Sequence, residues 1–564
     1  MTTYAQHVSR RATPQSEQAE AKQVENSAGG FSFALDKWSR LNRFLILGAE
    51  GGSYYASERK LTKENANCIQ DCLEEDGIRT VAEIVGISDS GRAPKNDPAI
   101  FALALAAAHD NVEVRREALK NLSAVCRIGT HLFQFVAAVR EFRGGGRALR
   151  KAIAAWYISR PADNLAYQVV KYRQRKIGDE TWSHRDIIRT YGRNQFRAVP
   201  SAAHEAVIRY VVRGAGDMGS REVKRKVGPG GNYQAVSEAP AILEGFDQLQ
   251  SATAASDVIA LIREHGLTHE MVPSEFKNDV AVWGALLEKM PMGAMVRNLA
   301  KMSAVGLLAP LSDASKFVAA RLADEEAIRK SRMHPLALLS AMKVYASGRG
   351  VRGSLTWTPV PQVIDGIEEG YYLAFPNIEP TGKNLLLALD VSSSMMSPNI
   401  AGLPGISPRI GSVAMAMATA RTEANYQFLA FTSKSGGPWA RGAALTPLDI
   451  SKRDRLDTAI QKVSGLSFGG TDCALPMIWA LDNKIKVDTF CVYTDSETWA
   501  GNIHPHQALK KYRRAINPDA KLIVVGMTSN GFTIADPSDA GMLDVVGFDT
   551  AAPGIMADFT RGNL

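Results

Sequence analysis

Apolar residues recur at helical spacing through the first two thirds of the chain. From about residue 41 to about residue 354, windows of roughly 10 to 20 residues carry apolar side chains at positions i, i+3, i+4 and i+7, and Gly, Pro, Asn or Asp residues separate the windows. The segment 110–122, DNVEVRREALKNL, has the acidic start and the Val, Ala and Leu positions of a HEAT-type helix. The pattern predicts a solenoid of diverged helical pairs rather than a compact bundle.

The pattern changes after residues 375–383, FPNIEPTGK, whose two prolines and glycine suit a linker. Continuous apolar runs follow at 384–389, 426–431, 489–493 and 522–525, and helical stretches lie around 413–421, 455–463, 474–480 and 507–515. Such runs are typical of strands that are buried on both faces of a parallel sheet. Strands that alternate with helices predict a doubly wound α/β domain.

The first 30 residues carry almost no large aliphatic side chains, so we expect a flexible arm there. The predicted parts are therefore 1–30 (arm), 31–370 (helical) and 371–564 (α/β). No apolar run is long enough to span a membrane, and the N-terminus lacks the apolar core of a signal peptide. Because the five cysteines are scattered and odd in number, we expect reduced thiols and a cytoplasmic protein.

The positive charge is concentrated in one part of the chain. The whole chain has a net charge of +8, but residues 381–564 hold 17 Lys and Arg against 16 Asp and Glu. Within the helical part, residues 140–197 hold 14 Lys and Arg against five Asp and Glu, a net charge of +9. An excess of this size in one window favours a nucleic-acid partner.

Helical phasing within this window places Leu149 and Ile153 on one face, and Arg147, Arg150 and Lys151 on the other. Further candidate RNA contacts are Lys171, Arg175, His184, Arg185 and Arg189. Lys171 and Arg175, four residues apart, are expected to share a helix face. The interleaved aromatic residues Tyr172, Trp182, Tyr191 and Phe196 suit base stacking, although any single ring is expected to pack in the core.

Oxygen donors follow the predicted strands of the last domain. Asp390, Ser392 and Ser394 form a DxSxS arrangement directly after the first strand, Thr471 follows a glycine pair, and Asp495 follows the strand at 489–493. A doubly wound sheet gathers such loops at its carboxyl edge. Because Mg²⁺ prefers oxygen ligands and often binds only one or two carboxylates, these five residues predict a site for a divalent metal, Mg²⁺ above all. Helix capping by Asp390 and the serines is the competing interpretation.

The sequence favours binding over catalysis. Metal-assisted hydrolysis needs a general base within reach, and His504 and His506 are expected to be surface residues because they flank Pro505 in a loop. No GxxxxGK[ST] loop is present, which argues against a P-loop NTPase. We therefore predict no catalytic residue.

Parts of the chain resemble two known families. The metal donors resemble the metal-ion-dependent adhesion site of von Willebrand factor A domains, in which a partner's oxygen completes the coordination sphere. The chain from about residue 31 onward resembles the Ro autoantigen, or TROVE-domain, RNA-binding proteins. Motifs that carry this resemblance are EGGSYY at 50–55, VCRI at 125–128, GRALRKAI at 146–153, WSHRD at 182–186, GTDC at 470–473 and GMTSNGFTIADP at 526–537.

The resemblance implies a monomeric ring of HEAT-like helices that is closed by a C-terminal von Willebrand factor A domain. Relatives bind small noncoding Y RNAs on the outer basic surface and admit single-stranded 3′ ends of misfolded noncoding RNA into the central hole. Bacterial members can hand RNA to a 3′ exoribonuclease. By position, Lys171 and Arg175 match the family's Y RNA contacts, and Asp390, Ser392, Ser394, Thr471 and Asp495 match its metal site.

The chain departs from the family in two places. It has extra residues between Arg175 and Trp182, and a histidine that the family places after the WSH motif aligns near Gly192. Three hypotheses stay open: an RNA-binding ribonucleoprotein scaffold, a metal-dependent protein-binding scaffold without RNA specificity, and a metal-dependent hydrolase that acts on RNA.

Overall fold

The structure is a computed structural model of the whole chain. It describes residues 12–48, 67–192, 195–196, 199–214, 239–351, 353–375, 379–396, 400, 405–433, 444–467 and 469–564, together with the backbone of 223–227 and 232–236. Among these residues, no helix combines the length and the apolar character that a membrane span requires.

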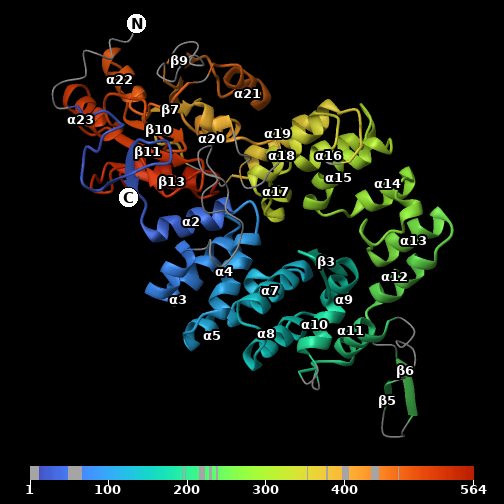
Figure 1. Cartoon of the computed structure of the whole chain (residues 1–564). Helices are drawn as coiled ribbons and strands as arrows, with labels where there is room; N and C mark the ends of the chain where they lie inside the picture. The colour runs from blue at the N-terminus through green and yellow to red at the C-terminus, as the bar shows by residue number, and fades with distance from the viewer. Residues whose placement is uncertain are drawn as a thin grey trace.

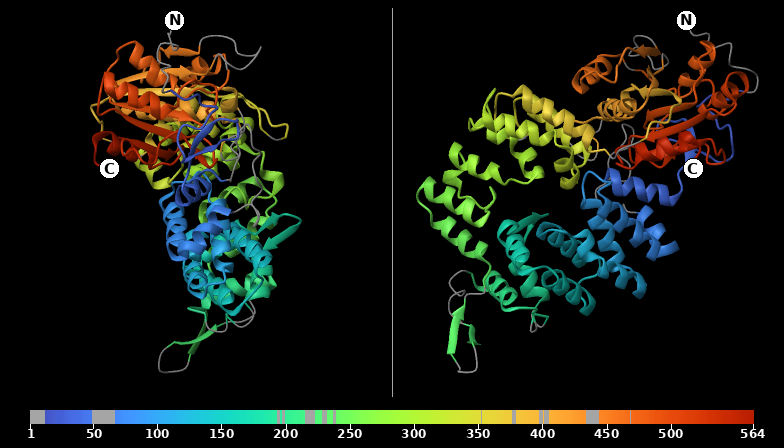
Figure 2. Two further views of the ribbon diagram at one scale, coloured as in Figure 1. Left: turned by 60° about the vertical axis from the view of Figure 1, so that its left-hand side comes forward. Right: turned by 180° about the vertical axis from the view of Figure 1, so that it is seen from behind.

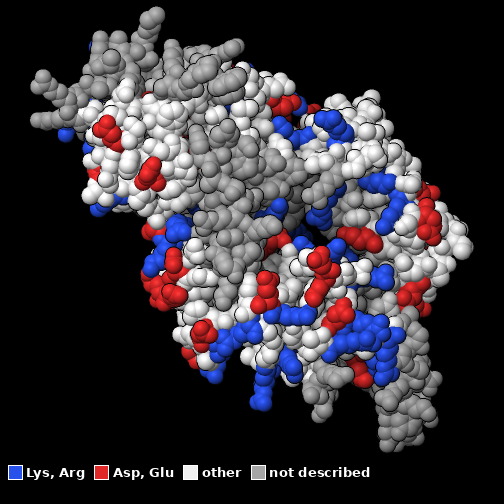
Figure 3. All heavy atoms as spheres, viewed as in Figure 1, with Lys and Arg blue, Asp and Glu red and all other residues white. Residues whose placement is uncertain are grey.

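Helices follow one another around a ring in the first two thirds of the chain (Figure 1). The periodicity predicts the helices, and the family resemblance implies the ring. Figure 3 shows a hollow near the middle of this ring. The helices are α2 (Lys37–Leu47), α3 (Asn67–Ser90), α4 (Asp97–Ala108), α5 (Val112–Lys120), α6 (Leu122–Val125), α7 (Gly129–Phe142), α8 (Arg147–Ile158), α9 (Ala162–Lys171), α10 (His184–Tyr191), α11 (Ala202–Arg213), α12 (Ala241–Ser251), α13 (Ala255–His265), α14 (Val280–Glu288), α15 (Met292–Ala304), α16 (Asp313–Leu322), α17 (Glu325–Ser331), α18 (Pro335–Ala346) and α19 (Pro361–Leu373), with a 3₁₀ turn η3 (Ser274–Phe276).

Two antiparallel hairpins interrupt the helices. One pairs β3 (Gln174–Ile177) with β4 (Glu180–Ser183), and the other pairs β5 (Val223–Val227) with β6 (Asn232–Val236). The views in Figures 1 and 2 agree that the second hairpin projects away from the ring beside α11 and α12. Neither hairpin is expected from the helical periodicity.

The C-terminal domain is built on a six-stranded sheet with the order β13-β11-β10-β7-β8-β9. Its strands are β7 (Asn384–Asp390), β8 (Asn425–Phe431), β9 (Leu445–Leu448), β10 (Thr489–Thr494), β11 (Lys521–Gly526) and β13 (Met542–Val546). All neighbours are parallel except β9, which is antiparallel to β8. The four predicted strands are confirmed; the sequence did not predict the edge strands β9 and β13, which are short and only partly apolar.

Helices cover both faces of the sheet, which confirms the doubly wound architecture. Leu385, Leu387 and Leu389 of β7 belong to a core that continues into the ring, whereas Leu386 and Ala388 face a second, separate core. Burying one such leucine stabilises a fold by about 1.5 to 3 kcal/mol. The covering elements are η4 (Ser393–Met396), α20 (Pro408–Thr422), α21 (Leu456–Ser464), α22 (Leu475–Asp482), α23 (Pro505–Ala515) and α24 (Ala552–Arg561).

The N-terminal segment is ordered from residue 12 onward, so the prediction of a flexible arm is wrong for residues 12–30; residues 1–11 lie outside the described ones. Strands β1 (Gln23–Glu25) and β2 (Phe31–Ala34) pair with each other and with β12 (Phe532–Thr533) of the C-terminal domain. The segment carries almost no large aliphatic residues of its own, and it is ordered because the distant domain supplies hydrogen-bond partners.

Both ends of the helical ring bind the C-terminal domain. At the start, the buried guanidinium of Arg43 on α2 forms two hydrogen bonds of 2.8 and 2.9 Å with Asp544 on β13. At the end, Arg455 pairs with Asp365 of α19 at 2.5 Å. These contacts close the ring through the α/β domain (Figure 2).

Candidate nucleic-acid interface and candidate metal centre

Helix α8 presents its basic residues to solvent, which confirms the predicted phasing. Arg147, Arg150 and Lys151 are exposed, and Leu149 and Ile153 are buried on the opposite face. Three positive charges therefore project into solvent on the side of α8 opposite its buried face.

Helix α10 contacts α8 and carries a second basic face. Its start is fixed by a capping box: the Ser183 hydroxyl accepts a hydrogen bond from the Asp186 amide, and the Asp186 carboxylate accepts one from the Ser183 amide at 3.0 Å. Arg185 and Arg189 are exposed and Ile188 is buried. We call Arg147, Arg150, Lys151, Arg185 and Arg189 the outer basic surface. Figure 3 shows Lys and Arg side chains along the edge of the ring where these helices lie.

Charges of neighbouring helices meet at Tyr191, the last residue of α10. Burial raises the pKa of its phenol, and the positive charges of Arg140 on α7 and Arg150 on α8 oppose that rise. Both guanidinium groups therefore lie close enough to lower the pKa of Tyr191. Positive charges of α7 and α8 are thus found near the end of α10.

Lys171 and Arg175 do not share a helix face, contrary to the prediction. Helix α9 ends at Lys171, and Arg175 lies on strand β3. The chain turns back at Gly178, whose φ of +57° suits glycine, so the extra residues after Arg175 form the β3–β4 hairpin. The four-residue spacing of Lys171 and Arg175 predicted one continuous helix, but α9 ends before the hairpin begins.

The surroundings of these two residues also differ. The Lys171 side chain is only 8% exposed; its Nζ donates to the Tyr167 hydroxyl at 2.8 Å and lies 3.9 Å from a Glu270 carboxylate oxygen. The Arg175 side chain is 38% exposed, and its Nη2 lies 3.5 Å from an Asp97 carboxylate oxygen. Arg175 is accessible to an RNA phosphate, whereas Lys171 is mostly covered.

His184 is a core residue, so its prediction as an RNA contact is corrected. Its Nδ1 lies 2.8 Å from the Tyr157 hydroxyl, and its ring packs edge-on against Phe133 with centroids 4.8 Å apart. Burial lowers its pKa to about 3. A Cβ at Gly129 would lie 2.6 Å from its Nε2, so a glycine makes room for the imidazole. His184 is the first residue of α10, and its side chain points toward α7 and α8.

The position of the missing family histidine is closed to a larger side chain. A Cβ on Gly192 would lie 2.3 Å from the Phe196 ring and 2.6 Å from the Ile188 carbonyl oxygen. Trp182 and Tyr191 are buried, as expected for single aromatic rings, and are unavailable for stacking on bases.

The predicted metal donors meet at the carboxyl edge of the sheet, and all five are buried. The Asp390 carboxylate at the end of β7 accepts hydrogen bonds from the Ser392 amide at 2.9 Å and the Thr494 hydroxyl at 2.7 Å. The Ser392 and Ser394 hydroxyls are 2.9 Å apart. Asp495 follows β10, the strand beside β7.

The electrostatics of these donors suit a divalent cation. Burial raises the pKa of Asp390, and hydrogen bonds from Ser392 and Thr494 oppose that rise. Burial and the charges of Asp390 and Glu497 raise the pKa of Asp495 to about 8, and a Ser394 hydrogen bond opposes them. Two carboxylates that burial destabilises would regain their charged form beside a divalent ion.

Two of the donor atoms lack a protein partner. Asp495 Oδ2 and Thr471 Oγ1 are buried and have no hydrogen-bond partner within the described part of the chain. Such atoms are rare unless a ligand satisfies them. Across that same part, no three His, Cys, Asp or Glu side chains cluster as metal ligands, so the site relies on hydroxyl oxygens beside its two carboxylates. This donor set fits a hard ion such as Mg²⁺.

Three residues that contact or act on the predicted donors were not predicted from the sequence. Thr494 bonds Asp390, Glu497 acts on Asp495, and Arg409 of α20 donates to the Val391 carbonyl while its charge acts on Asp390. The spacing Asp495-x-Glu497 was a readable signal for Glu497. Arg409 gave none, because its position depends on how α20 packs.

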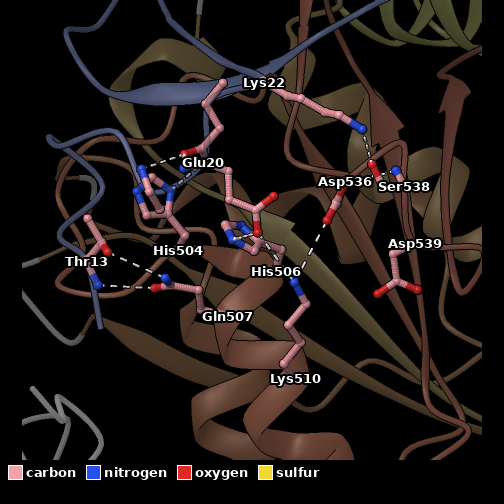
Figure 4. A network of polar contacts seen from close by, with 12 residues as sticks. Thr13, Glu20, Lys22, His504, His506, Gln507, Lys510, Asp536, Ser538 and Asp539 are labelled. Atoms are coloured by element: carbon pink, nitrogen blue, oxygen red, sulfur yellow. Dashed lines mark hydrogen bonds and ion pairs between the residues drawn. The ribbon is translucent and has the colours of Figure 1, made fainter. Parts of the chain in front are cut away.

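His504 and His506 are both buried, so the prediction of surface residues is wrong. The N-terminal segment covers them (Figure 4): His504 Nε2 lies 2.8 Å from the Glu17 carbonyl oxygen, and His506 Nε2 lies 3.3 Å from a Glu20 carboxylate oxygen. Burial lowers the pKa of His506 to about 4. These contacts direct the two rings toward the N-terminal segment.

Known proteins are similar to this chain over nearly its whole length. The family model of the TROVE domain matches residues 24–343, and that of the Ro60 vWA domain matches residues 384–560. The RNA-binding protein RO60 of Deinococcus radiodurans is 39% identical over 553 residues, 98% of each chain. The RNA-binding protein RO60 of Caenorhabditis elegans is 37% identical over 617 residues, 98% of this chain and 92% of that one. The crystal structure of the Deinococcus radiodurans RO (RSR) protein superposes with a TM-score of 0.67 at 38% identity, covering 94% of this chain and 100% of the other.

Proposed function

Because the chain belongs to the Ro60 family, with both its TROVE domain and its Ro60 vWA domain, we propose that it is an RNA-binding scaffold. Small noncoding, Y-like RNA binds the outer basic surface, and single-stranded 3′ ends of misfolded noncoding RNA enter the hollow of the ring. The scaffold hands such RNA to a 3′ exoribonuclease for quality control. The observation that carries the proposal is the set of five exposed cationic side chains on the adjacent helices α8 and α10.

The outer basic surface suits a phosphate backbone. Its arginines project from helices whose opposite faces are buried, so binding needs no refolding of the ring. Each phosphate that a Lys or Arg neutralises releases counterions, which makes the affinity depend on salt. Arg175 on the β3–β4 hairpin, partly exposed beside Asp97, is a further candidate contact outside this surface.

We expect the triple variant Arg147→Ala, Arg150→Ala, Lys151→Ala to bind a structured small RNA at least tenfold more weakly. The slope of log affinity against log salt should fall in magnitude by roughly 2 to 3, because about 0.7 to 0.9 is lost for each phosphate contact. Gel shifts across a salt series measure both quantities.

A charge-matched control replaces Lys316, Arg329 and Lys330 with Ala. These residues are exposed on α16 and α17, across the ring from the outer basic surface (Figure 1). If the control loses as much affinity as the triple variant, net charge and not this surface governs binding. A wild-type salt slope near zero would contradict RNA binding altogether.

The proposed cofactor is Mg²⁺, held by Asp390, Ser392, Ser394, Thr471 and Asp495. The bound ion would supply an electrophilic position that an oxygen of a partner protein completes. The orphaned oxygens of Thr471 and Asp495 support this proposal. They also favour the alternative function, a metal-dependent protein-binding scaffold without RNA specificity. RNA affinity that responds to the outer basic surface but not to Asp390→Asn distinguishes the first function from the second.

We propose that the protein is not an enzyme. His504 and His506, the candidate general bases, are covered by the N-terminal segment: His504 bonds the Glu17 carbonyl, and His506 lies against Glu20, which supports this view. Incubation of the protein with end-labelled RNA and Mg²⁺ is expected to leave the RNA intact. Shortening of the RNA by wild type but not by Asp390→Ala would instead establish a metal-dependent hydrolase.

The proposed compartment is the cytoplasm. All five cysteines are buried thiols outside any disulfide, as the sequence predicted, which suits a reducing environment.

A further inference from the structure

The N-terminal segment lies over the loops that supply the two distant metal donors. Thr471 precedes helix α22, and Asp495 precedes helix α23. These are separate connections of the sheet, and they contact each other directly, because the Trp499 and Ala500 amides donate to the Thr471 carbonyl at 3.1 and 3.0 Å. Residues 12–34 run along the loop 496–503 before joining β12 (Figure 1).

Gln15 joins the two loops through its side-chain amide, which is fully buried. Its Nε2 donates to Asp472 Oδ1, next to Thr471, and to the Ile503 carbonyl oxygen, both at 2.8 Å. Its Oε1 accepts from the Thr498 hydroxyl. One amide therefore bonds the residue beside Thr471 and two residues of the Asp495 loop.

The residue types around Gln15 match its amide. A carboxylate oxygen needs a donor and the Thr498 hydroxyl needs an acceptor, and only an amide side chain of this length provides both. A Cβ at Gly501 would lie 2.3 Å from Gln15 Nε2 and 2.4 Å from Asp472 Oδ1, so Gly501 leaves room for this contact. A pair of backbone bonds, Gln15 amide to Gly501 carbonyl and Phe31 amide to Gln15 carbonyl, both 2.8 Å, locks the residue in place.

A second set of contacts holds the residues directly after Asp495. The Ser32 hydroxyl donates to the Ser496 carbonyl at 3.0 Å, the Ala28 amide donates to the Glu497 carboxylate at 3.2 Å, and the Asn26 side-chain amide donates to the Thr498 carbonyl at 2.8 Å. A Cβ at Gly30 would lie 2.0 Å from the Thr498 carbonyl oxygen. Only glycine permits this approach, so the segment and the loop fit closely over three successive residues.

We propose that the N-terminal segment is a strap that positions the metal centre, with Gln15 as the positioning residue that reinforces the contact between the Thr471 and Asp495 loops. The inference rests on the proposed metal centre. Residues that orient metal ligands typically change metal affinity by 10- to 100-fold when they are lost. Docking of the strap therefore raises the affinity of the site for a divalent cation.

The test uses the full-length protein and Mn²⁺ alone, whose unbound fraction electron paramagnetic resonance measures directly. Gln15→Leu keeps the side-chain volume and removes every side-chain hydrogen bond, and we expect it to bind Mn²⁺ 10- to 100-fold more weakly. Gln15→Glu keeps the shape but sets a carboxylate against Asp472, and the same weakening is expected. Hydrogen exchange of the amides in 496–503 should accelerate in both variants, while that of β7 and β10 stays as in wild type.

Lys22→Met is the matched control. Lys22 belongs to the same segment, and its Nζ donates to the Ser538 hydroxyl at 2.6 Å, outside the metal loops (Figure 4). The Lys22→Met substitution should leave the affinity for Mn²⁺ unchanged, whereas Asp390→Asn should abolish Mn²⁺ binding. If both Gln15 variants bind Mn²⁺ with wild-type affinity while Asp390→Asn does not bind it, the proposed role of the strap is wrong and the proposed metal centre is retained. Absence of Mn²⁺ binding by the wild type overturns both.

Discussion

Lys171 and Arg175 belong to one basic window, yet their side chains have different surroundings. Lys171 contacts Tyr167 and Glu270, and Arg175 lies partly exposed beside Asp97. Burial raises the pKa of Glu270, but the His269 hydrogen bond and charge, together with the charge of Lys171, outweigh burial and bring the pKa to about 2. Lys171 is thus part of a polar network inside the ring wall, and Arg175 is a candidate RNA contact.

This difference predicts separable effects of two substitutions. Lys171→Ala should lower the free energy of unfolding by about 1 to 2 kcal/mol, because a largely buried pair loses its cation. Arg175→Ala should leave stability within about 0.5 kcal/mol and weaken binding of a structured RNA. Thermal denaturation and gel shifts on the same samples measure both. Equal loss of stability in the two variants would contradict the assignment, and unchanged RNA affinity in Arg175→Ala would remove Arg175 from the interface.

At the scale of elements, the local sequence pattern suffices to predict helices α8 and α10. It does not suffice to predict the β3–β4 hairpin. The amphipathic phasing of α8 puts Leu149 inside and Arg150 outside without reference to any other element. The hairpin depends on a turn at Gly178 and on antiparallel pairing across it, which helical spacing does not reveal. As a result, Arg175 moves from the expected helix face to a strand.

The N-terminal strands show the same limit. Segment 12–34 has too few apolar residues to order itself, and its order comes from β12 and from the loop 496–503. Its position near the start of the chain gave no sign of a partner 488 residues later. A segment that depends on such distant contacts for its order cannot be predicted from its own composition.

At the scale of the whole molecule, His334 stands where the ring closes. Its Nε2 lies 2.7 Å from the Phe548 carbonyl oxygen of the C-terminal domain and 3.0 Å from the Arg92 carbonyl oxygen, and its Nδ1 accepts from the Leu336 amide at 3.1 Å. The neutral Nε2–H tautomer satisfies all three contacts. Arg92 adds an ion pair with Asp549 at 2.5 Å.

Ring closure should therefore weaken in acid. Burial lowers the pKa of His334 from 6.5 to about 4, so between these values the unfolded chain binds a proton that the folded chain does not. Stability contributed by His334 is complete above pH 6.5 and falls as pH drops toward 4, by at most about 3 kcal/mol. Tm measured from pH 7.5 to pH 5 should decline, and His334→Gln should reduce that decline. An identical pH dependence in wild type and variant would contradict this role.

The sequence by itself determined the elements whose cause is local. Buried strands such as β7 and β10 follow from continuous apolar runs, and the helices of the ring follow from their periodicity. The meeting of the five predicted donors was predictable because residues that follow parallel strands come together at one edge of the sheet. Exposure of Arg147, Arg150 and Lys151 follows from the helical phasing of α8 alone.

Only the tertiary structure decided the features that depend on distant partners. His184 is buried because α7 and α8 pack over it, and His504 and His506 are buried because the strap covers them. Lys171 is covered because Glu270, from the turn after α13, joins Tyr167 of its own helix against the side chain. The contacts of Gln15 with Asp472 and Thr498 likewise span most of the chain. Residue type and spacing specify what a side chain can bond, but packing between remote segments decides which partner it meets.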